Sequence, residues 1–443
     1  MSSTTGHPVH TGRRRGVAGL VALAAVTAVL GGGQPAAATE DTDPVVRWAG
    51  RAAVPIRDLD RPGPDLARLR HATREARIVG LGEAAHKLTE VTALKRRAVE
   101  YLIEERGFRS LAWEDDWTLG IQINDYIHGR RDDRDALVAQ MSRSWRTREV
   151  ADLLTWLRGY NSTHDNRVRF VGVEYFTTRP LAYDAVEAYV AQQAPHRLAE
   201  VRELLEPIKP AGDDMRAHLD WYMNVDQEPY LRSARRLHRL VAGIGHRPGD
   251  RGYAVAVHHA KQIRSWYTAF SLPREEVYAY RDARAAENLR WWQRFSGDKV
   301  IYWAAAAHTA DAPDLAITAP SAPDVRFAGV GSYLDDWYRD RYVTIGYTFD
   351  RGSMDATPGN PIDLPPAADD WFEAPLGGVD HSQFLLAPGK NVPARVRDWL
   401  NASMVTRGDP SLGPSSTMTG STPADWFDLI VHRQEVSPAT PLP

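Results

Sequence analysis

After residue 40, short apolar runs typical of β-strands alternate with stretches in which apolar residues recur at helical spacing. Strands are predicted at 77–82, 109–114, 168–173, 299–304, 342–347 and 428–432. Helices are predicted from His86 to Leu102 and at 119–127, 148–160, 230–242, 254–269 and 283–295. Successive strand–helix units favour parallel pairing. The pattern therefore predicts an α/β fold with a mostly parallel central sheet flanked by helices.

The domain organisation follows from where this alternation stops. Residues 180–298 lack clear strands, so we expect a helical insertion there that forms a cap over a pocket. Strand-like sequence resumes afterwards, and the stretches 355–380 and 408–423, which are rich in Pro and Gly, are predicted to be surface loops. We therefore expect a single domain over residues 39–443.

The amino-terminal segment has the order of a signal peptide. Arg13, Arg14 and Arg15 precede an apolar run, 17–30, and Ala36–Ala38 supply small residues for cleavage after Ala38. The segment 1–38 is therefore predicted to direct export by the general secretory or the twin-arginine route. No later apolar stretch is long enough to cross a bilayer, so we expect a secreted or extracytoplasmic protein without a stable membrane span.

Composition narrows the range of partners. The 443 residues carry a formal charge of -3 with acidic and basic residues interspersed, which argues against a nucleic-acid partner. There is no cysteine, which excludes disulfides, thiolate metal sites and a cysteine nucleophile.

Candidate chemistry lies where the predicted strands end, which is where open α/β sheets form their ligand sites. Five polar residues stand at these positions: Glu83, His86, Glu114, Glu174 and His308. If the strands are parallel neighbours, these side chains converge at one edge of the sheet.

The residue types suit general-base chemistry. His86 is expected in the first turn of a helix, where the helix dipole keeps the ring neutral and able to accept a proton. Glu83 and Glu114 would orient that ring or position a water, and His308 would protonate a leaving group or donate to an oxyanion. Trp117 and Trp145 are candidates for substrate contact.

Other interpretations of the same residues are also open. Glu-x-x-His alone also occurs at ordinary helix starts, and Glu83, His86, Glu114 and His308 are ligand types that zinc, iron or manganese accept. A serine-hydrolase elbow and a complete dinucleotide-binding glycine motif are both missing. No cofactor is therefore expected.

Several motifs, in order along nearly all of the chain after residue 78, resemble the erythromycin esterase family. They are VGLGEAAH (79–86), RGFR (106–109), WEDDW (113–117), WRTREV (145–150), WLRGYN (156–161), RVRFVGVE (167–174), Arg281-Asp282, AEN (286–288) and GYTF (346–349).

The resemblance implies metal-independent opening of a macrolide lactone by water, with His86 as general base and Glu83 and Glu114 as the two essential glutamates. Lys95 stands where the family has an arginine, and with Glu174 it is assigned to substrate binding. After the fourth strand the family reads Trp-Ala-His-Asn-x-His, whereas this chain has Ala305 and Ala306 in place of the first histidine and the asparagine.

We therefore expect an exported hydrolase that opens an ester or lactone of a bulky, polyketide-like molecule. One alternative is a general-base cyclase or transferase of secondary metabolism that activates a substrate hydroxyl. A second is a catalytically degenerate protein that binds such a ligand, and a third is a metalloprotein that uses the same pocket.

Overall fold

The computed structural model describes residues 43–442 except for 60, 62, 358 and 390. The predicted signal peptide, residues 1–38, lies outside the described residues. Among the described residues, no helix is both long and apolar enough to span a membrane.

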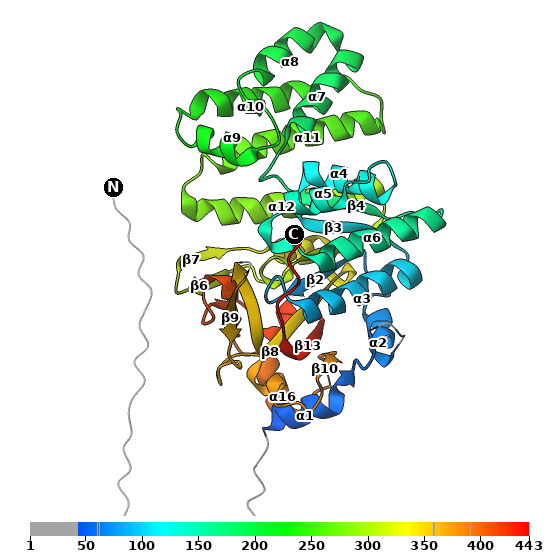
Figure 1. Cartoon of the computed structure of the whole chain (residues 1–443), viewed down its shortest axis with the longest axis vertical. Helices are drawn as coiled ribbons and strands as arrows, with labels where there is room; N and C mark the ends of the chain where they lie inside the picture. The colour runs from blue at the N-terminus through cyan, green and yellow to red at the C-terminus, as the bar shows by residue number, and fades with distance from the viewer. Residues whose placement is uncertain (1–42, 60, 62, 358, 390, 443) are drawn as a thin grey trace, which may run out of the picture. The chain divides into compact units, whose positions relative to one another are not determined.

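A mostly parallel sheet, with nine strands in the described part of the chain, lies at the centre of the fold (Figure 1). Its order is β1-β10-β13-β8-β2-β5-β3-β4, and β9 pairs with β8 outside this row. The strands from β13 to β4 pair in parallel, whereas β1, β10 and β9 pair antiparallel. The bounds are β1 (Val54–Pro55), β2 (Ile78–Glu83), β3 (Phe108–Asp116), β4 (Arg169–Glu174), β5 (Lys299–Ala305), β8 (Tyr342–Thr357), β9 (Asn360–Leu364), β10 (Gln383–Leu386) and β13 (Leu429–Val436).

The six parallel strands confirm the predicted fold class. Each begins within one residue of the position expected from its apolar run. The physical reason is that a parallel strand is covered on both faces, so its sequence is continuously apolar. In β2, for example, all six residues are buried.

Helices cover both faces of this sheet. On one face, α3 (Thr89–Arg106) and α6 (Arg148–Thr163) share a hydrophobic core with Val79 and Leu81 of β2. On the other face, α12 (Arg274–Ser296) and α14 (Val330–Tyr338) pack with Ile78 of β2 and Tyr302 of β5. Adjacent residues of β2 thus face opposite layers, as the alternation of side chains along a strand requires.

The segment predicted as a helical insertion is helical in the structure. Helices α7 to α11 form a layer with a hydrophobic core of its own, which includes the fully buried Tyr183, Leu237 and Trp266 (Figure 1). Their bounds are α7 (Pro180–Gln193), α8 (Leu198–Leu205), α9 (Met215–Tyr222), α10 (Glu228–Ala242) and α11 (Arg251–Ala269). The part of the insertion that reaches the pocket described below is α12.

A smaller antiparallel sheet completes the cover of that pocket. In the described residues it has the order β11-β12-β6-β7, with bounds β6 (Leu315–Ala319), β7 (Ala322–Phe327), β11 (Thr406–Arg407) and β12 (Thr417–Thr419). The prediction of a surface loop at 408–423 is therefore wrong, because β12 lies within it and pairs with β6. The stretch 355–380 likewise contains β9 and α15 (Ala374–Gly377).

The remaining helices are short or lie at the periphery of the sheet. They are α1 (Pro44–Ala52), α2 (Pro64–Ala72), α4 (Trp117–Ile127), α5 (Arg134–Gln140), α13 (Ala306–Thr309), α16 (Ala394–Leu400) and α17 (Pro423–Trp426).

A close approach of α4 to β4 depends on two glycines. A Cβ atom at Gly172 would lie 2.0 Å from the backbone oxygen of Asp116, and one at Gly120 would lie 2.2 Å from the backbone nitrogen of Gly172. Asp116 also caps α4, because its side chain accepts hydrogen bonds from the backbone N–H groups of Thr118 and Leu119. The junction between β3, α4 and β4 therefore leaves no space for side chains at either glycine.

We predict that Gly172→Ala lowers the free energy of unfolding by about 3 kcal/mol, because backbone atoms would have to move to admit the methyl group. The matched control is Gly159→Ala, which is exposed on α6 with no atom within 4 Å of the new Cβ. This control should gain roughly 0.5–1 kcal/mol from reduced backbone entropy of the unfolded chain. Urea unfolding curves of both variants test the prediction, which fails if Gly172→Ala is as stable as the control.

Candidate active site

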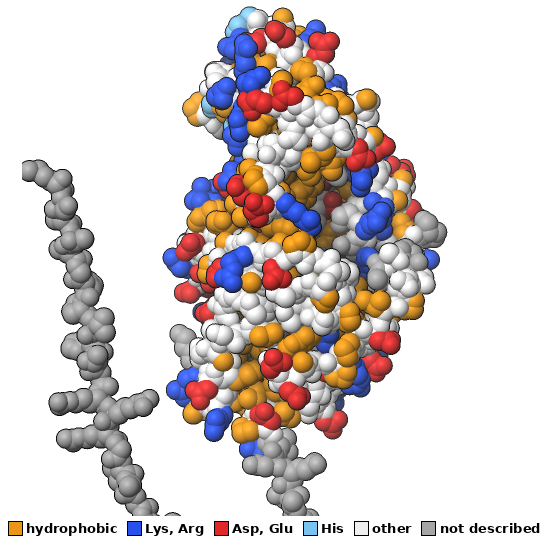
Figure 2. Space-filling view, turned by 90° about the vertical axis from the view of Figure 1, so that its left-hand side faces the viewer, with side chains coloured by type: hydrophobic (Ala, Val, Ile, Leu, Met, Phe, Trp, Pro, Cys, Tyr) orange, Lys and Arg blue, Asp and Glu red, His pale blue; other side chains and the backbone are white. Residues whose placement is uncertain are grey.

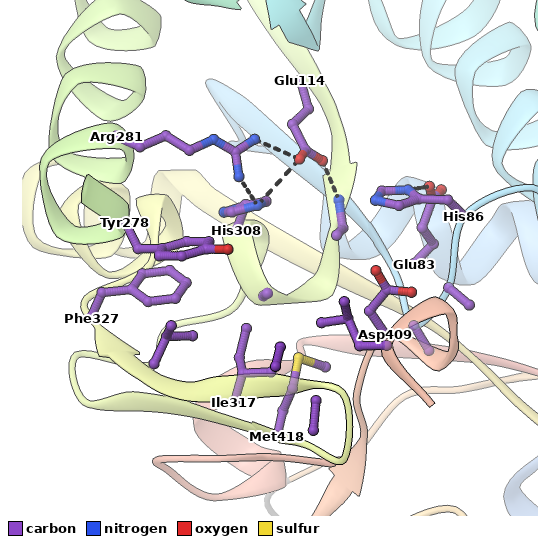
Figure 3. A pocket seen from close by; sticks show the side chains of 18 of the residues that line it. Glu83, His86, Glu114, Tyr278, Arg281, His308, Ile317, Phe327, Asp409 and Met418 are labelled. Carbon is purple, nitrogen blue, oxygen red and sulfur yellow. Dashed lines mark hydrogen bonds and ion pairs between the residues drawn. The ribbon is translucent and has the colours of Figure 1, made fainter. Parts of the chain in front are cut away.

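A cavity of about 240 Å³ lies at the carboxyl ends of β2, β3 and β5. It is lined by Glu83, His86, Glu114 and His308 from the main sheet and its loops, and by residues of α12 and the smaller sheet (Figure 3). The structure thus brings together the four residues that the sequence predicted as catalytic. Their convergence follows from the parallel order β2-β5-β3, which aligns the carboxyl ends of these strands.

Glu83 and His86 form a hydrogen-bonded pair on one side of the cavity. The Nδ1 atom of His86 lies 2.6 Å from Oε1 of Glu83, the last residue of β2. Trp145 packs edge-on against the imidazole, with ring centroids 4.6 Å apart. A proton on Nδ1 is therefore held by the carboxylate, and Nε2 on the opposite edge of the ring is directed towards the cavity (Figure 3).

The expected location and charge of His86 need correction. His86 lies in the loop before α3, which begins at Thr89, and not in the first turn of the helix. Burial by itself would lower the pKa of His86, but the hydrogen bond and charge of Glu83 and the charges of Glu114 and Asp409 raise it overall above 6.5. Nearby carboxylates, rather than a helix dipole, control this ring.

Lys95 also does not lie where the sequence predicted. Its side chain is fully buried, its Nζ atom donates to Oε2 of Glu83 and to the backbone oxygen of Ala304, and it lies 4.2 Å from the ring centroid of Trp303. Burial lowers the pKa of Lys95 to about 8, although the charge of Glu83 opposes this shift. Lys95 is not among the residues that line the cavity, so it holds Glu83 from behind instead of contacting a substrate there.

On the other side of the cavity, Glu114 joins two cationic groups. Its Oε1 atom lies 2.7 Å from Nη2 of Arg281 and 3.2 Å from Nε2 of His308, and its Oε2 atom accepts a hydrogen bond of 2.9 Å from the backbone N–H of Ala305. The Nδ1 atom of His308 contacts Asp282 at 2.8 Å. Arg281 and Asp282, neighbours on α12, thus bind Glu114 and His308 respectively.

These contacts determine the charges of the cluster. Burial by itself would raise the pKa of Glu114, but the charges of His308 and Arg281 hold it well below its usual range. Burial would likewise lower the pKa of His308, yet the charges of Asp282 and Glu114 outweigh it and raise that pKa to about 10. At neutral pH, Glu114 is therefore ionised and His308 is an imidazolium that faces Asp282 and Glu114. Nη1 of Arg281 also lies 2.8 Å from Nε2 of His308, and the charge of this guanidinium opposes the rise in the pKa of His308.

The predicted substrate-binding residues Trp117, Trp145 and Glu174 do not line the cavity. Trp117 is buried on the other face of the sheet, where its indole N–H donates to His259 at 3.2 Å. Trp145 supports His86, and its own N–H donates to the backbone oxygen of Glu114 at 2.9 Å.

Glu174 lies behind Arg281, which contacts its Oε1 atom at 2.9 Å. Burial raises the pKa of Glu174 to about 7, although Arg281 opposes this shift. Glu174 therefore stabilises the guanidinium and is not placed to bind a substrate.

Sequence reasoning missed four lining or supporting residues: Tyr278, Arg281, Asp282 and Asp409. Arg281 and Asp282 belong to a motif of the resemblance, which was the one available signal for them. Asp409 precedes a short 3-10 turn in the stretch predicted as a surface loop, and nothing in its local sequence indicated that it faces His86 (Figure 3).

The two alanines that depart from the family pattern are Ala305 and Ala306. Ala305 pairs with Glu83 across β5 and β2 and lines the cavity between the two halves of the site, whereas Ala306 is the first residue of α13 and does not line the cavity. Neither offers a side-chain donor. Within the described residues, no group of three or more His, Asp or Glu side chains is arranged to hold a metal ion.

Curated proteins with similar sequences match over short segments. Erythromycin esterase type II of Escherichia coli is 30% identical over 29% of this chain and 30% of its own length. The putative hydrolase YbfO of Bacillus subtilis is 30% identical over 25% of each chain, and erythromycin esterase type I of Escherichia coli is 22% identical over 32% of each. The aligned segments thus span about a third of these relatives or less.

Solved structures match over nearly the whole chain. A Bacillus cereus protein has a TM-score of 0.78 at 23% identity, covering 90% of this chain and 99% of its own. A succinoglycan biosynthesis protein has a TM-score of 0.75 at 23% identity, with 91% and 100% covered. A mutant of the erythromycin esterase EreC in its open conformation has a TM-score of 0.68 at 16% identity, with 88% and 99% covered. At these identities the likeness shows a common fold.

The sequence model of one family matches most of the chain. It covers residues 103–436, which include Glu114, Arg281 and His308, while Glu83 and His86 precede the match. On this match, the protein belongs to the erythromycin esterase family.

Proposed function

We propose that this protein is an exported hydrolase that opens an ester or lactone of a bulky small molecule, with His86 as general base. The observation that carries the proposal is the 2.6 Å contact between Glu83 and Nδ1 of His86, which leaves Nε2 free at a cavity that His308 also lines. A carboxylate that fixes the imidazole tautomer in this way is the usual support of a general base.

The proposed reaction begins with a water molecule between His86 and the substrate carbonyl. Nε2 of His86 takes a proton from the water as its oxygen attacks the carbonyl carbon. The tetrahedral intermediate then collapses, the bond to the alcohol oxygen breaks, and the proton returns to that oxygen. One water is consumed, and an acid and an alcohol are formed.

The opposite side of the cavity would stabilise the negative charge that develops on the carbonyl oxygen. His308 and Arg281 are both cationic at neutral pH and line the cavity there. Donors held in place before the reaction lower its barrier because they need little reorganisation. Since Ala305, which stands in place of the family's first histidine, has no side-chain donor, this task falls to His308 and Arg281.

Export and the type of partner belong to the same proposal. The basic, apolar and small-residue order of residues 1–38 supports a secretory signal. The net charge of -3 and the interspersed acidic and basic side chains in Figure 2 support a small molecule rather than a nucleic acid as partner.

We expect the purified protein to add one water to at least one member of a panel of macrolides and other lactones, detected by mass spectrometry. His86→Ala should lower the rate by about 100-fold or more, the usual contribution of a positioned general base. The matched control is His196→Ala. His196 is exposed and does not line the cavity, so this substitution should leave the rate unchanged.

Two results would contradict the proposal. Binding of a panel member without any product, unaffected by His86→Ala, would indicate a ligand-binding protein. Conversion of a hydroxy ester or hydroxy acid at unchanged mass, or with loss of water, would indicate a cyclase.

The rate of hydrolysis should depend on pH through the protonation of His86. Because the carboxylates raise the pKa of His86, kcat/KM should increase with pH and level off, with a midpoint above 6.5. Below the midpoint the ring is protonated and cannot act as a base. Glu83→Gln should lower both the midpoint and the plateau, since it removes a negative charge and weakens the support of the ring. Asp409→Asn should lower the midpoint by less, and a midpoint that rises in either variant would refute this account.

A further inference from the structure

The side of the cavity opposite the charged residues is apolar. Figure 3 shows Tyr278, Phe327, Ile317 and Met418 facing the charged residues across the cavity. Tyr278 and Phe327 stack with ring centroids 5.7 Å apart. Ile317 is partly exposed although it lies in the middle of β6, so this wall presents apolar surface to the cavity.

The cations at the cavity already have acidic partners. Among the described residues that line the cavity, three have basic side chains: His86, Arg281 and His308. Each of them contacts at least one carboxylate. Asp409 adds a further negative charge near His86. A negatively charged substrate would therefore find no unpaired cation among these residues.

We infer that the cavity accepts an uncharged ester or lactone whose group beside the carbonyl is compact and apolar. Its volume of about 240 Å³ lies just below the range of roughly 300–1,000 Å³ typical of pockets that enclose drug-sized ligands. A bulky substrate would thus insert its reacting end and leave the rest outside. This inference rests on the proposed function and specifies its substrate class.

The test compares p-nitrophenyl esters of acetic, butanoic and phenylacetic acids and the p-nitrophenyl hemisuccinate. We expect kcat/KM to rise by about 10-fold or more from acetate to phenylacetate, as apolar area is buried, and to be lowest for the hemisuccinate. Ile317→Ala should raise KM for phenylacetate by about 5-fold with little change for acetate. The matched control Ile121→Ala, on α4 and away from the cavity, should change neither.

Equal kcat/KM across the series, or preference for the hemisuccinate, would overturn the inference. If no ester is hydrolysed, the proposed function fails, and calorimetric binding of phenylacetamide and acetamide then decides the inference separately. Tighter binding of phenylacetamide that is weakened by Ile317→Ala would support it, and no preference would overturn it.

A second, independent observation concerns residues 437–442, which lie across the loop that carries His86. Figure 1 shows the carboxyl end of the chain in front of β2 and α6. Ala439 donates its backbone N–H to the backbone oxygen of Lys87 at 2.8 Å, and Thr89 donates its own to Ser437 at 3.0 Å. We call residues 437–442 the strap.

The strap is also anchored on both sides of this loop. The backbone N–H and the hydroxyl of Ser437 donate to Glu90 of α3 at 2.8 and 2.9 Å. The backbone N–H of Thr440 donates to Glu149 of α6 at 3.0 Å, and Arg148 donates its backbone N–H to Thr440 at 2.9 Å. The strap therefore ties the loop to the first turns of α3 and α6.

The residue directly after His86 is held in an unfavourable backbone conformation. Lys87 has φ of 59°, and among the described non-glycine residues it shares a positive φ with Arg339 alone. Residues with a Cβ atom seldom adopt this region unless the surroundings impose it. The hydrogen bond from Ala439 to Lys87 is a contact that can impose it here.

We propose that the strap keeps Lys87 in this conformation and thereby positions His86 against Glu83.

Ala439→Pro removes the N–H that binds Lys87 and should lower kcat by about 10-fold with little change in KM. It should also lower the pH midpoint, because the contact that raises the pKa of His86 loosens. Glycine adopts a positive φ freely, so adding Lys87→Gly to Ala439→Pro should restore much of the lost kcat and much of the decrease in the pH midpoint. Arg339→Gly, the other residue of this kind, should restore neither.

An Ala439→Pro variant with unchanged kcat and midpoint would overturn the proposal, as would losses that Lys87→Gly does not reverse. If Ala439→Pro does not fold, Glu90→Gln weakens the strap without constraining the backbone and is measured in the same way. Titration of His86 by NMR reports its pKa in each variant without requiring turnover. The role of the strap is thus tested even if no ester is hydrolysed.

Discussion

Two buried carboxylates at the carboxyl ends of parallel strands are the constraint on which the rest of the site depends. Glu83 and Glu114 are 3% and 8% exposed. An ionised carboxylate at such a position costs several kcal/mol unless cations or hydrogen-bond donors hold it. Glu83 is held by Lys95 and His86, and Glu114 by Arg281, His308 and a backbone N–H.

This pairing also separates the two histidines chemically. His86 is hydrogen-bonded to one carboxylate, Glu83, and the carboxylates around it raise its pKa above 6.5 although burial opposes this shift. His308 lies between Asp282 and Glu114, which raise its pKa to about 10 and keep it charged. Groups whose surroundings push their pKa values apart are suited to opposite roles, one as base and the other as a donor. The geometry therefore supports different roles for the two histidines on the two sides of one small cavity.

Much of the fold could be predicted from the sequence, and the limit of that prediction has a physical cause. The six parallel strands are buried on both faces, so each is visible as a continuous apolar run. The strands β6, β7, β11 and β12 are short and antiparallel, and all of them except β11 are partly exposed. Two of them, β11 and β12, lie beside or in a stretch rich in Pro and Gly. Only the pairing of β12 with β6 joins segments that lie far apart in the sequence, and the strands themselves are too short for local periodicity to reveal them.

The candidate site, like the fold, could be predicted from the sequence only in part. By itself, the sequence determined that Glu83, Glu114, Glu174 and His308 stand at or just after strand ends, because strand periodicity and chain order are local properties. Tertiary structure alone decided which of these groups meet, which partners they have and how they are charged. Lys95 and Trp117 do not line the cavity, while α12, far beyond β4 in the sequence, places Arg281 at the cavity and Asp282 against His308. These outcomes depend on how distant segments pack, and packing sets burial, hydrogen bonding and pKa, none of which the spacing of residues along the chain specifies.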